Sequence, residues 1–325
     1  MKIRYKHQRF QAEAAKCVSD VFQGQPKHDG SRTFLNKFGA LNFDGFGNFP
    51  LVLDNESICE NVRGIQMAEG LNPVEHLEGD GRTFTIEMET GTGKTYTYIK
   101  TMYELNKHYG WSKFIVVVPS IAIREGVKKS FEITVDHFME HYGKKARFFI
   151  YSSANLNQLD SFSADSGINV MIINTQAFAA SLKEDGKSKE ARIIYSKRDE
   201  FQSRRPIDVI AANRPIIIMD EPQKMGGDVT QKALKSFNPL FTLNYSATHK
   251  ERHNLIYVLD ALDAYNKRLV KRIEVKGFEV KNFRGTDGYL YLESFILSPK
   301  QPPKVRMELE IRYNKSINRE TRQLT

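Results

Sequence analysis

The sequence predicts an α/β fold in which helices cover both faces of a parallel sheet, followed by a β-rich segment. Three observations predict it. After residue 82, short apolar runs alternate with stretches at helical spacing, as in a doubly wound sheet. A glycine-rich turn joins the first of these runs to the first helical stretch, as in parallel sheets that bind phosphates. Beyond about residue 270, apolar and polar residues alternate, which is the period of strands.

The first 82 residues precede this alternating pattern. Apolar residues at helical spacing predict an amphipathic helix over residues 7–22. Residues 24–82 interleave glycine with phenylalanine, and we expect most of this stretch to be an irregular insertion. One short helix is expected within it, near Ser57–Glu69.

The strands and helices of the sheet follow in order. The expected strands are Thr83–Met88, Phe114–Val118, Arg147–Tyr151, Val170–Ile173, Ile216–Met219 and Leu240–Asn244. A helix over Lys94–His108 follows the first strand, and another begins at Ser120 after the second. In the tail, alternating stretches begin near Ile273, Tyr289 and Val305.

These elements suggest three parts. Residues 1–82 form the N-terminal helix and the insertion, which we expect to pack on a lobe. Residues 83–270 form that lobe, and residues 271–325 begin a β-rich linker subdomain. No internal repeat is evident in the sequence.

Composition excludes several classes of protein. No apolar run approaches the roughly 18 residues that a membrane-spanning helix requires, and the first residues do not resemble a signal peptide. Cys17 and Cys59 form no C-x-x-C pair, so we expect no disulfide framework or cysteine-based zinc site, and a reducing cytoplasm fits best.

The charge balance is basic, with 48 Lys and Arg against 39 Asp and Glu, a net charge of +9. Residues 250–325 contain 16 of the basic and 10 of the acidic residues. A basic excess favours polyanionic partners such as DNA, although a solvated basic face is the alternative.

The strongest motif is a phosphate-binding loop between the first strand and its helix. Its sequence is Glu89-Thr90-Gly91-Thr92-Gly93-Lys94-Thr95. Small residues let consecutive N–H groups surround a phosphate at a helix N-terminus. Lys94 can reach the β- and γ-phosphates of ATP, and the Thr95 hydroxyl can ligate Mg²⁺. Met88 stands where the strict motif has its first glycine, and the form present is the one used by helicase-like motors.

Two further motifs follow later strands. Asp220-Glu221-Pro222-Gln223 comes after a buried-strand run, and carboxylates at the ends of parallel strands lie beside the phosphate loop. Asp220 is expected to hold Mg²⁺ and Glu221 to act as general base toward the attacking water. Ser246-Ala247-Thr248 follows the last strand. Its hydroxyls, with Gln223, either couple the acids to a bound polymer or only cap the following helix.

Together these motifs resemble the first lobe, RecA-like in fold, of a superfamily 2 helicase-type ATPase. The match is closest to the type III restriction enzyme Res subunit, because that family shares the following segments with this chain: 87–95, 117–127, 220–223, 246–249 and 259–266. The D-E-P-Q variant is distinctive, since most relatives carry D-E-A-D or D-E-x-H. The resemblance covers residues 3–280 and implies an ATP-dependent, Mg²⁺-requiring DNA translocase or helicase of the bacterial cytosol.

The resemblance also implies roles that spacing alone does not. His7–Gln11 resembles the Q motif whose glutamine recognises adenine, with Gln11 the better fit and Gln8 the alternative. Ser120 and Arg124 resemble motif Ia, and Thr175 and Gln176 resemble motif Ib, both of which contact the nucleic-acid backbone. Ser120 and Thr175 could equally be helix caps. The partners implied are duplex DNA and a modification methyltransferase subunit.

Two features of such proteins do not occur in the sequence. No Q-x-x-G-R-x-x-R motif follows Ser246, and no P-D…E-x-K nuclease pattern is present. We therefore expect an N-terminal fragment that lacks the second lobe with its arginine finger, so that in isolation it is nearly inactive in ATP hydrolysis. The alternatives are another superfamily 2 DNA or RNA helicase or remodeller, and a nucleotide-binding module that has lost hydrolysis.

Overall fold

The computed structural model describes residues 5–35, 41–179, 193–201, 203–225, 227–271, 289–299, 301–313 and 316–324. By the density of its internal contacts the chain divides into two units, Met1–Arg272 and Ile273–Thr325. Each unit has its own sheet.

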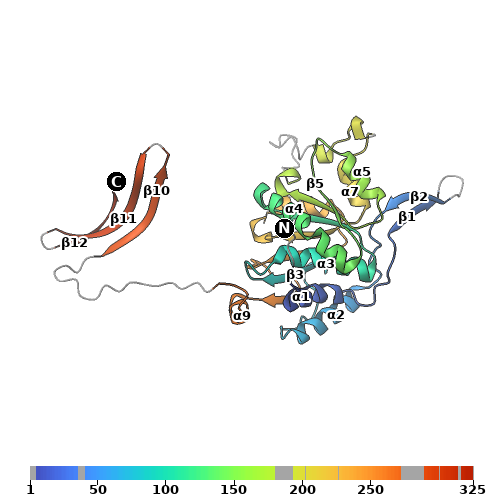
Figure 1. Cartoon of the computed structure of the whole chain (residues 1–325), viewed down its shortest axis with the longest axis horizontal. Helices are drawn as coiled ribbons and strands as arrows, with labels where there is room; N and C mark the ends of the chain where they lie inside the picture. The colour runs from blue at the N-terminus through green and yellow to red at the C-terminus, as the bar shows by residue number, and fades with distance from the viewer. Residues whose placement is uncertain are drawn as a thin grey trace. The chain divides into compact units, whose positions relative to one another are not determined.

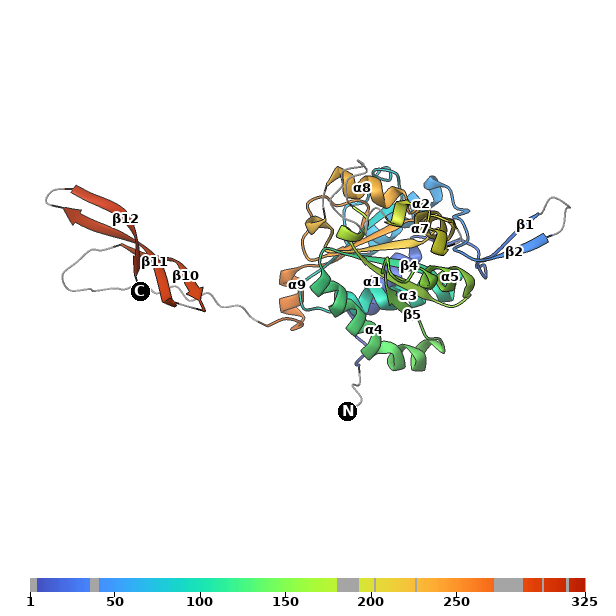
Figure 2. The ribbon, with the colours of Figure 1, turned by 90° about the horizontal axis from the view of Figure 1, so that it is seen from above.

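The first unit is built on a seven-stranded sheet. Its strands are β3 (Thr83–Met88), β4 (Lys113–Val118), β5 (Arg147–Ile150), β6 (Asn169–Asn174), β7 (Ile216–Asp220), β8 (Thr242–Ser246) and β9 (Leu255–Leu259). They lie in the order β5-β6-β4-β7-β8-β3-β9, and all neighbours pair in parallel (Figures 1 and 2). Because all its carboxyl ends share one edge, this sheet can gather residues that are far apart in the sequence.

Helices cover both faces of the sheet. The first face packs on α1 (Arg9–Asp20), α2 (Asn55–Ala68), α3 (Lys94–Tyr109) and α4 (Ile121–Tyr142). The second packs on α5 (Asn157–Ala164), α7 (Pro206–Ala212) and α8 (Asp228–Lys235). In β4, Phe114 and Val116 contribute to the first core and Ile115 and Val117 to the second, because successive side chains of a strand point to opposite faces. The predicted fold class is confirmed.

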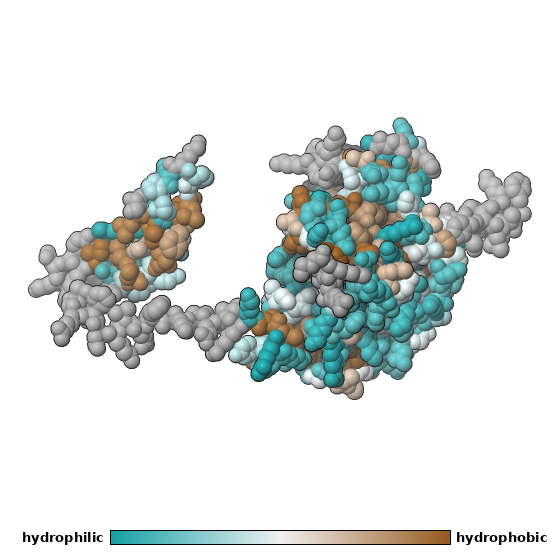
Figure 3. All heavy atoms as spheres, viewed as in Figure 1, coloured by the Kyte–Doolittle hydropathy of each residue, from teal (hydrophilic) through white to brown (hydrophobic). Residues whose placement is uncertain are grey.

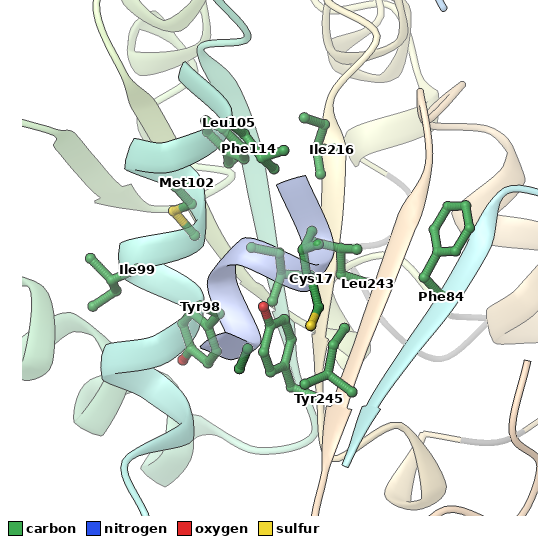
Figure 4. Packing of buried hydrophobic residues seen from close by; sticks show 14 of the residues in the cluster. Cys17, Phe84, Tyr98, Ile99, Met102, Leu105, Phe114, Ile216, Leu243 and Tyr245 are labelled. Atoms are coloured by element: carbon green, nitrogen blue, oxygen red, sulfur yellow. The ribbon is translucent and has the colours of Figure 1, made fainter. Parts of the chain in front are cut away.

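The first core holds α1 against the sheet. In Figure 4, Cys17 of α1 lies beside Leu243 and Tyr245 of β8, while Tyr98 and Met102 project from α3. Both cysteines are buried and unbridged, as expected for small apolar side chains. Burial raises the pKa of the Cys17 thiol well above its usual range, so this thiol stays protonated.

The first unit also contains several short helical segments. They are η1 (Thr175–Ala177), η2 (Asp199–Phe201), η3 (Pro222–Lys224) and α9 (Ala261–Asn266). The Asp260 side chain caps α9 by accepting a hydrogen bond from the Asp263 N–H.

Three details of the first unit differ from the sequence-based expectation. A hairpin, β1 (Ser31–Leu35) and β2 (Leu41–Phe46), lies in the stretch expected to be irregular and projects from the lobe in Figures 1 and 2. Strand β8 begins two residues later than expected, because Leu240 and Phe241 precede the ladder and pack into the core. Strand β9 was missed, although it pairs with β3 at the edge of the sheet.

The second unit contains an antiparallel sheet of β10 (Leu290–Ser298), β11 (Gln301–Tyr313) and β12 (Ser316–Leu324), in that order. The expected β-rich segment is therefore present, whereas the strand expected near Ile273 lies outside the described residues. Leu290, Phe295 and Leu297 are among its exposed apolar residues, and Figure 3 shows brown, hydrophobic residues on the surface of this unit. Among all residues that the structure describes, no helix combines the length and apolar character needed to cross a membrane.

Candidate functional site

Three adjacent strands bring the predicted catalytic motifs to one edge of the sheet. The register aligns Asp220 of β7 with Tyr245 of β8, and Ser246 of β8 with Glu87 of β3. The phosphate loop follows β3, the D-E-P-Q segment follows β7, and the S-A-T segment follows β8. Topology therefore brings the phosphate loop next to two motifs that follow it by more than a hundred residues of sequence.

The phosphate loop has the backbone that its glycines permit. Gly91 and Gly93 adopt φ angles of +83° and +90°, which L-residues with a side chain rarely adopt. A Cβ atom at Gly93 would also lie 2.6 Å from the Gln11 amide nitrogen. The buried Thr92 fixes the turn, because its hydroxyl donates to the Glu89 carbonyl at 2.6 Å. The Thr90 N–H donates to the Glu89 carboxylate at 2.6 Å.

Gln11 lies against the phosphate loop. Helix α1 buries its side chain, and the amide nitrogen donates to the Thr92 carbonyl at 3.0 Å. The structure thus places the predicted Q-motif glutamine next to the loop, whereas Gln8 is the N-cap position of α1.

Lys94 and Glu221 form an ion pair across the site. The Lys94 Nζ lies 3.2 Å from Glu221 Oε1, and both side chains are largely buried. Lys94 Nζ also lies 3.4 Å from the Met88 carbonyl. Burial alone would raise the Glu221 pKa, but the Lys94 charge and a hydrogen bond from Gln223 outweigh it and hold that pKa below its usual value. Glu221 is therefore ionised at neutral pH in this structure.

Asp220 has the opposite electrostatic environment. It is 6% exposed, and burial together with the neighbouring Glu221 charge raises its pKa to about 6. The Tyr98 hydroxyl donates to Asp220 Oδ2 at 3.3 Å and also interacts with the Thr95 side chain. Tyr98 therefore links the two residues predicted to hold Mg²⁺.

A hydrogen-bond network connects the D-E-P-Q and S-A-T segments. Glu221 adopts a left-handed backbone conformation with φ +62°, which few non-glycine residues tolerate outside functional sites. The fully buried Ser246 hydroxyl lies 3.2 Å from Glu221 Oε2 and 2.9 Å from Gln223 Oε1. The Thr248 N–H donates to Ser246 Oγ at 3.2 Å. The four predicted residues are thus in one cluster.

These residues fit a Mg²⁺–nucleotide. The loop presents glycine-permitted turns at the N-terminus of α3, where the helix dipole favours anions. Lys94 supplies a cation, and Thr95 and Asp220 supply oxygen ligands of the kind that Mg²⁺ prefers.

The residues predicted to contact DNA lie on the same edge of the sheet, beside the nucleotide motifs. Strands β6 and β4 are neighbours, with Asn174 opposite Val118, and β4 adjoins β7. Ser120 and Arg124 lie just after β4. Thr175 and Gln176 lie in η1, just after the neighbouring strand β6. The Ser120 hydroxyl caps α4 by accepting from the Ile123 N–H at 3.3 Å. The Arg124 guanidinium contacts Glu125 at 3.1 Å, and its side chain is 20% exposed.

Comparison with known proteins decides the family. The family model described as "Type III restriction enzyme, res subunit" matches residues 57–251. The chain belongs to this family. The Res subunit of the type III restriction-modification enzyme EcoP15I from Escherichia coli is 30% identical over 241 residues, covering 70% of this chain and 25% of that protein. The EcoPI Res subunit of Escherichia phage P1 is 31% identical over 244 residues, again 70% and 25%.

This Res-family chain spans about a quarter of the length of these relatives. Among solved structures, it is similar to a nuclease-deletion mutant of the Type ISP restriction-modification enzyme LlaGI in complex with a DNA substrate mimic. That similarity has a TM-score of 0.37 at 14% identity and covers 67% of this chain and 20% of the other.

Two features of this Res-family site were not expected from the sequence. Tyr98 lies one helical turn after Thr95, so the i,i+3 spacing could have suggested that the two side chains meet. The second feature is Glu87, a 6% exposed carboxylate in β3. Its sequence signal is that it is the one charged residue of the buried strand Thr83–Met88.

Proposed function

We propose that this chain is the first ATP-binding lobe of a type III restriction endonuclease Res subunit, which hydrolyses ATP to move along DNA. The observation that carries the proposal is the convergence of Lys94, the Asp220–Glu221 pair and Ser246 at the ends of three adjacent strands. Residues 1–82 would pack on the lobe 83–270, and 271–325 would begin the linker. The second lobe would lie outside these residues.

Each residue of the site has a role in this proposal. Gln11 would contact adenine, and the backbone of Thr90, Gly91, Thr92 and Gly93 would surround the phosphates. Thr95 and Asp220 would hold Mg²⁺, which when bound neutralises phosphate charge. Asp220 must be ionised for this, and with a pKa of about 6 it is so at neutral pH.

Glu221 would accept the proton of the attacking water. In this structure its carboxylate forms an ion pair with Lys94 at 3.2 Å. A bound phosphate would compete for Lys94, and the loss of that cation would raise the proton affinity of Glu221. Gln223 and Ser246 would keep the carboxylate oriented during this exchange, and with Thr248 they would couple the site to DNA.

The DNA path would run along the neighbouring strand ends. Ser120, Arg124, Thr175 and Gln176 would contact backbone phosphates, which positions DNA without reading its sequence. Sequence recognition would come from a modification methyltransferase subunit, in the cytoplasm. In the second unit, three arginines form ion pairs with glutamates: Arg306 with Glu293, Arg319 with Glu310 and Arg322 with Glu320.

Arg124→Ala is expected to weaken duplex binding by a similar factor on unrelated DNA sequences. Each phosphate contact releases counterions, so the slope of log affinity against log salt should become shallower by about one. Fluorescence-anisotropy titration of random duplexes at several salt concentrations measures both quantities.

Arg147→Ala is the matched control, since Arg147 begins β5 at the opposite edge of the sheet and is 74% exposed. It should leave both affinity and slope nearly unchanged. Affinity that is flat across salt concentrations, or an altered sequence preference in Arg124→Ala, would contradict the proposed DNA path.

A further inference from the structure

A segment after the S-A-T motif crosses the phosphate-loop strand and is bound to it. We call residues 247–254 the strap. The His249 ring nitrogen lies 3.3 Å from the Ile86 carbonyl, and the His253 N–H donates to Thr85 Oγ1 at 3.0 Å. At the end of the strap, the Asn254 amide donates to the Thr83 carbonyl at 2.9 Å. The strap therefore contacts β3 along most of its length.

One contact between strap and strand is ionic. Arg252 Nη2 lies 2.8 Å from Glu87 Oε2, and the Glu87 side chain is only 8% exposed. Taking a carboxylate out of water is costly unless a cation compensates it. An apolar pair could fill such a site at no greater cost, so stability alone does not require these charges. What the ion pair adds is a defined position for the strap.

The strap connects two parts of the site. Its first residues follow Ser246, whose hydroxyl contacts Glu221 and Gln223. Its contacts with β3 end one residue before Met88, after which the phosphate loop begins. A displacement of the strap would therefore move Ser246 relative to Glu221 and to the loop together.

We propose that the Glu87–Arg252 ion pair positions the strap so that DNA binding accelerates ATP hydrolysis. Arg252 is thus a positioning residue, acting through Glu87 and Ser246. This inference rests on the proposed function. It predicts that breaking the pair uncouples turnover from DNA while nucleotide affinity is retained, because neither residue touches the phosphate loop's Lys94 or Thr95.

The experiment uses a Res protein of the relatives' length that carries this sequence, with its DNA-recognition partner. The variants are Arg252→Gln, Arg252→Lys and the double variant Glu87→Gln/Arg252→Gln. Three quantities are measured well below the lowest Tm of the set: the ratio of kcat with and without DNA, the KM for ATP, and Tm. Arg205→Gln is the matched control, since it breaks the exposed ion pair between Arg205, the N-cap residue of α7, and Asp208.

Arg252→Gln should lower both Tm and the DNA stimulation, since it leaves Glu87 buried and unpaired. The double variant should recover Tm, yet its stimulation should remain at least about fivefold below wild type, with the KM for ATP unchanged. Arg252→Lys should show a DNA stimulation between that of Arg252→Gln and that of wild type. The control Arg205→Gln should keep the full wild-type stimulation.

Full stimulation in the double variant would overturn the proposal and leave the ion pair a purely structural feature. A wild-type protein without DNA-stimulated hydrolysis would instead overturn the proposed function itself. The two failures are therefore distinguishable.

Discussion

Replacing Glu221 by glutamine is expected to stop ATP turnover while leaving nucleotide binding intact. General-base catalysis contributes about 10²–10⁴ in rate, and the amide cannot accept the proton of the attacking water. The same change removes the partner that holds Lys94 at 3.2 Å, so Lys94 becomes free for phosphate. Nucleotide affinity should therefore be unchanged or higher.

This expectation is tested by single-turnover hydrolysis and equilibrium nucleotide binding in a Res protein of the relatives' length that carries this sequence. Glu60→Gln is a suitable control, since Glu60 is an exposed acid on α2, outside the nucleotide and DNA motifs, and it should turn over normally. Loss of nucleotide affinity in Glu221→Gln would contradict the separation of roles, because it would make Glu221 a binding residue.

Asp220→Asn is expected to raise the stability of the fold at neutral pH and, by removing a Mg²⁺ ligand, to abolish ATP hydrolysis. The pKa of Asp220 is raised to about 6 by burial and by Glu221, against about 3.9 in an unfolded chain. Between these values the folded state binds a proton that the unfolded state lacks, so stability falls as pH rises through this window. The loss at pH 7 is up to about 3 kcal/mol.

The asparagine variant does not lose stability in this way, because its side chain does not ionise. Its Tm should exceed that of the wild type by on the order of 5 °C at pH 7.5, and the difference should disappear near pH 4. Calorimetry at several pH values measures it, with the exposed Asp136→Asn as control. A lower Tm for Asp220→Asn at pH 7.5 would contradict the unfavourable burial of this carboxylate.

The catalytic core of the fold was predictable because its signals are local. The phosphate loop is recognisable from its glycines between a predicted strand and a predicted helix. The Asp220–Glu221 pair is recognisable from the apolar run that precedes it. Strand β9 was missed because no helix separates Leu255–Leu259 from β8, which breaks the strand–helix alternation, so its pairing with β3 is what identifies it. The hairpin of β1 and β2 likewise depends on pairing between partners.

The contacts within the site were less predictable than its residues. Tyr98 meets Asp220 across 122 residues of sequence, and the Glu87–Arg252 pair depends on how the strap crosses β3. Neither pattern has a spacing that sequence could reveal, because both follow from strand order. The roles assigned to Gln11 and to the DNA-contacting residues stay predictions.

The most direct test of the account is calorimetric titration of this chain with Mg²⁺ and a non-hydrolysable ATP analogue. Lys94→Ala removes the phosphate-binding cation, whereas Lys107→Ala removes an exposed lysine from the same helix, 3.9 Å from Glu104. The account predicts that wild type and Lys107→Ala bind with the same Kd and that Lys94→Ala binds at least about tenfold more weakly. Equal binding by all three, or no binding by the wild type, would contradict it.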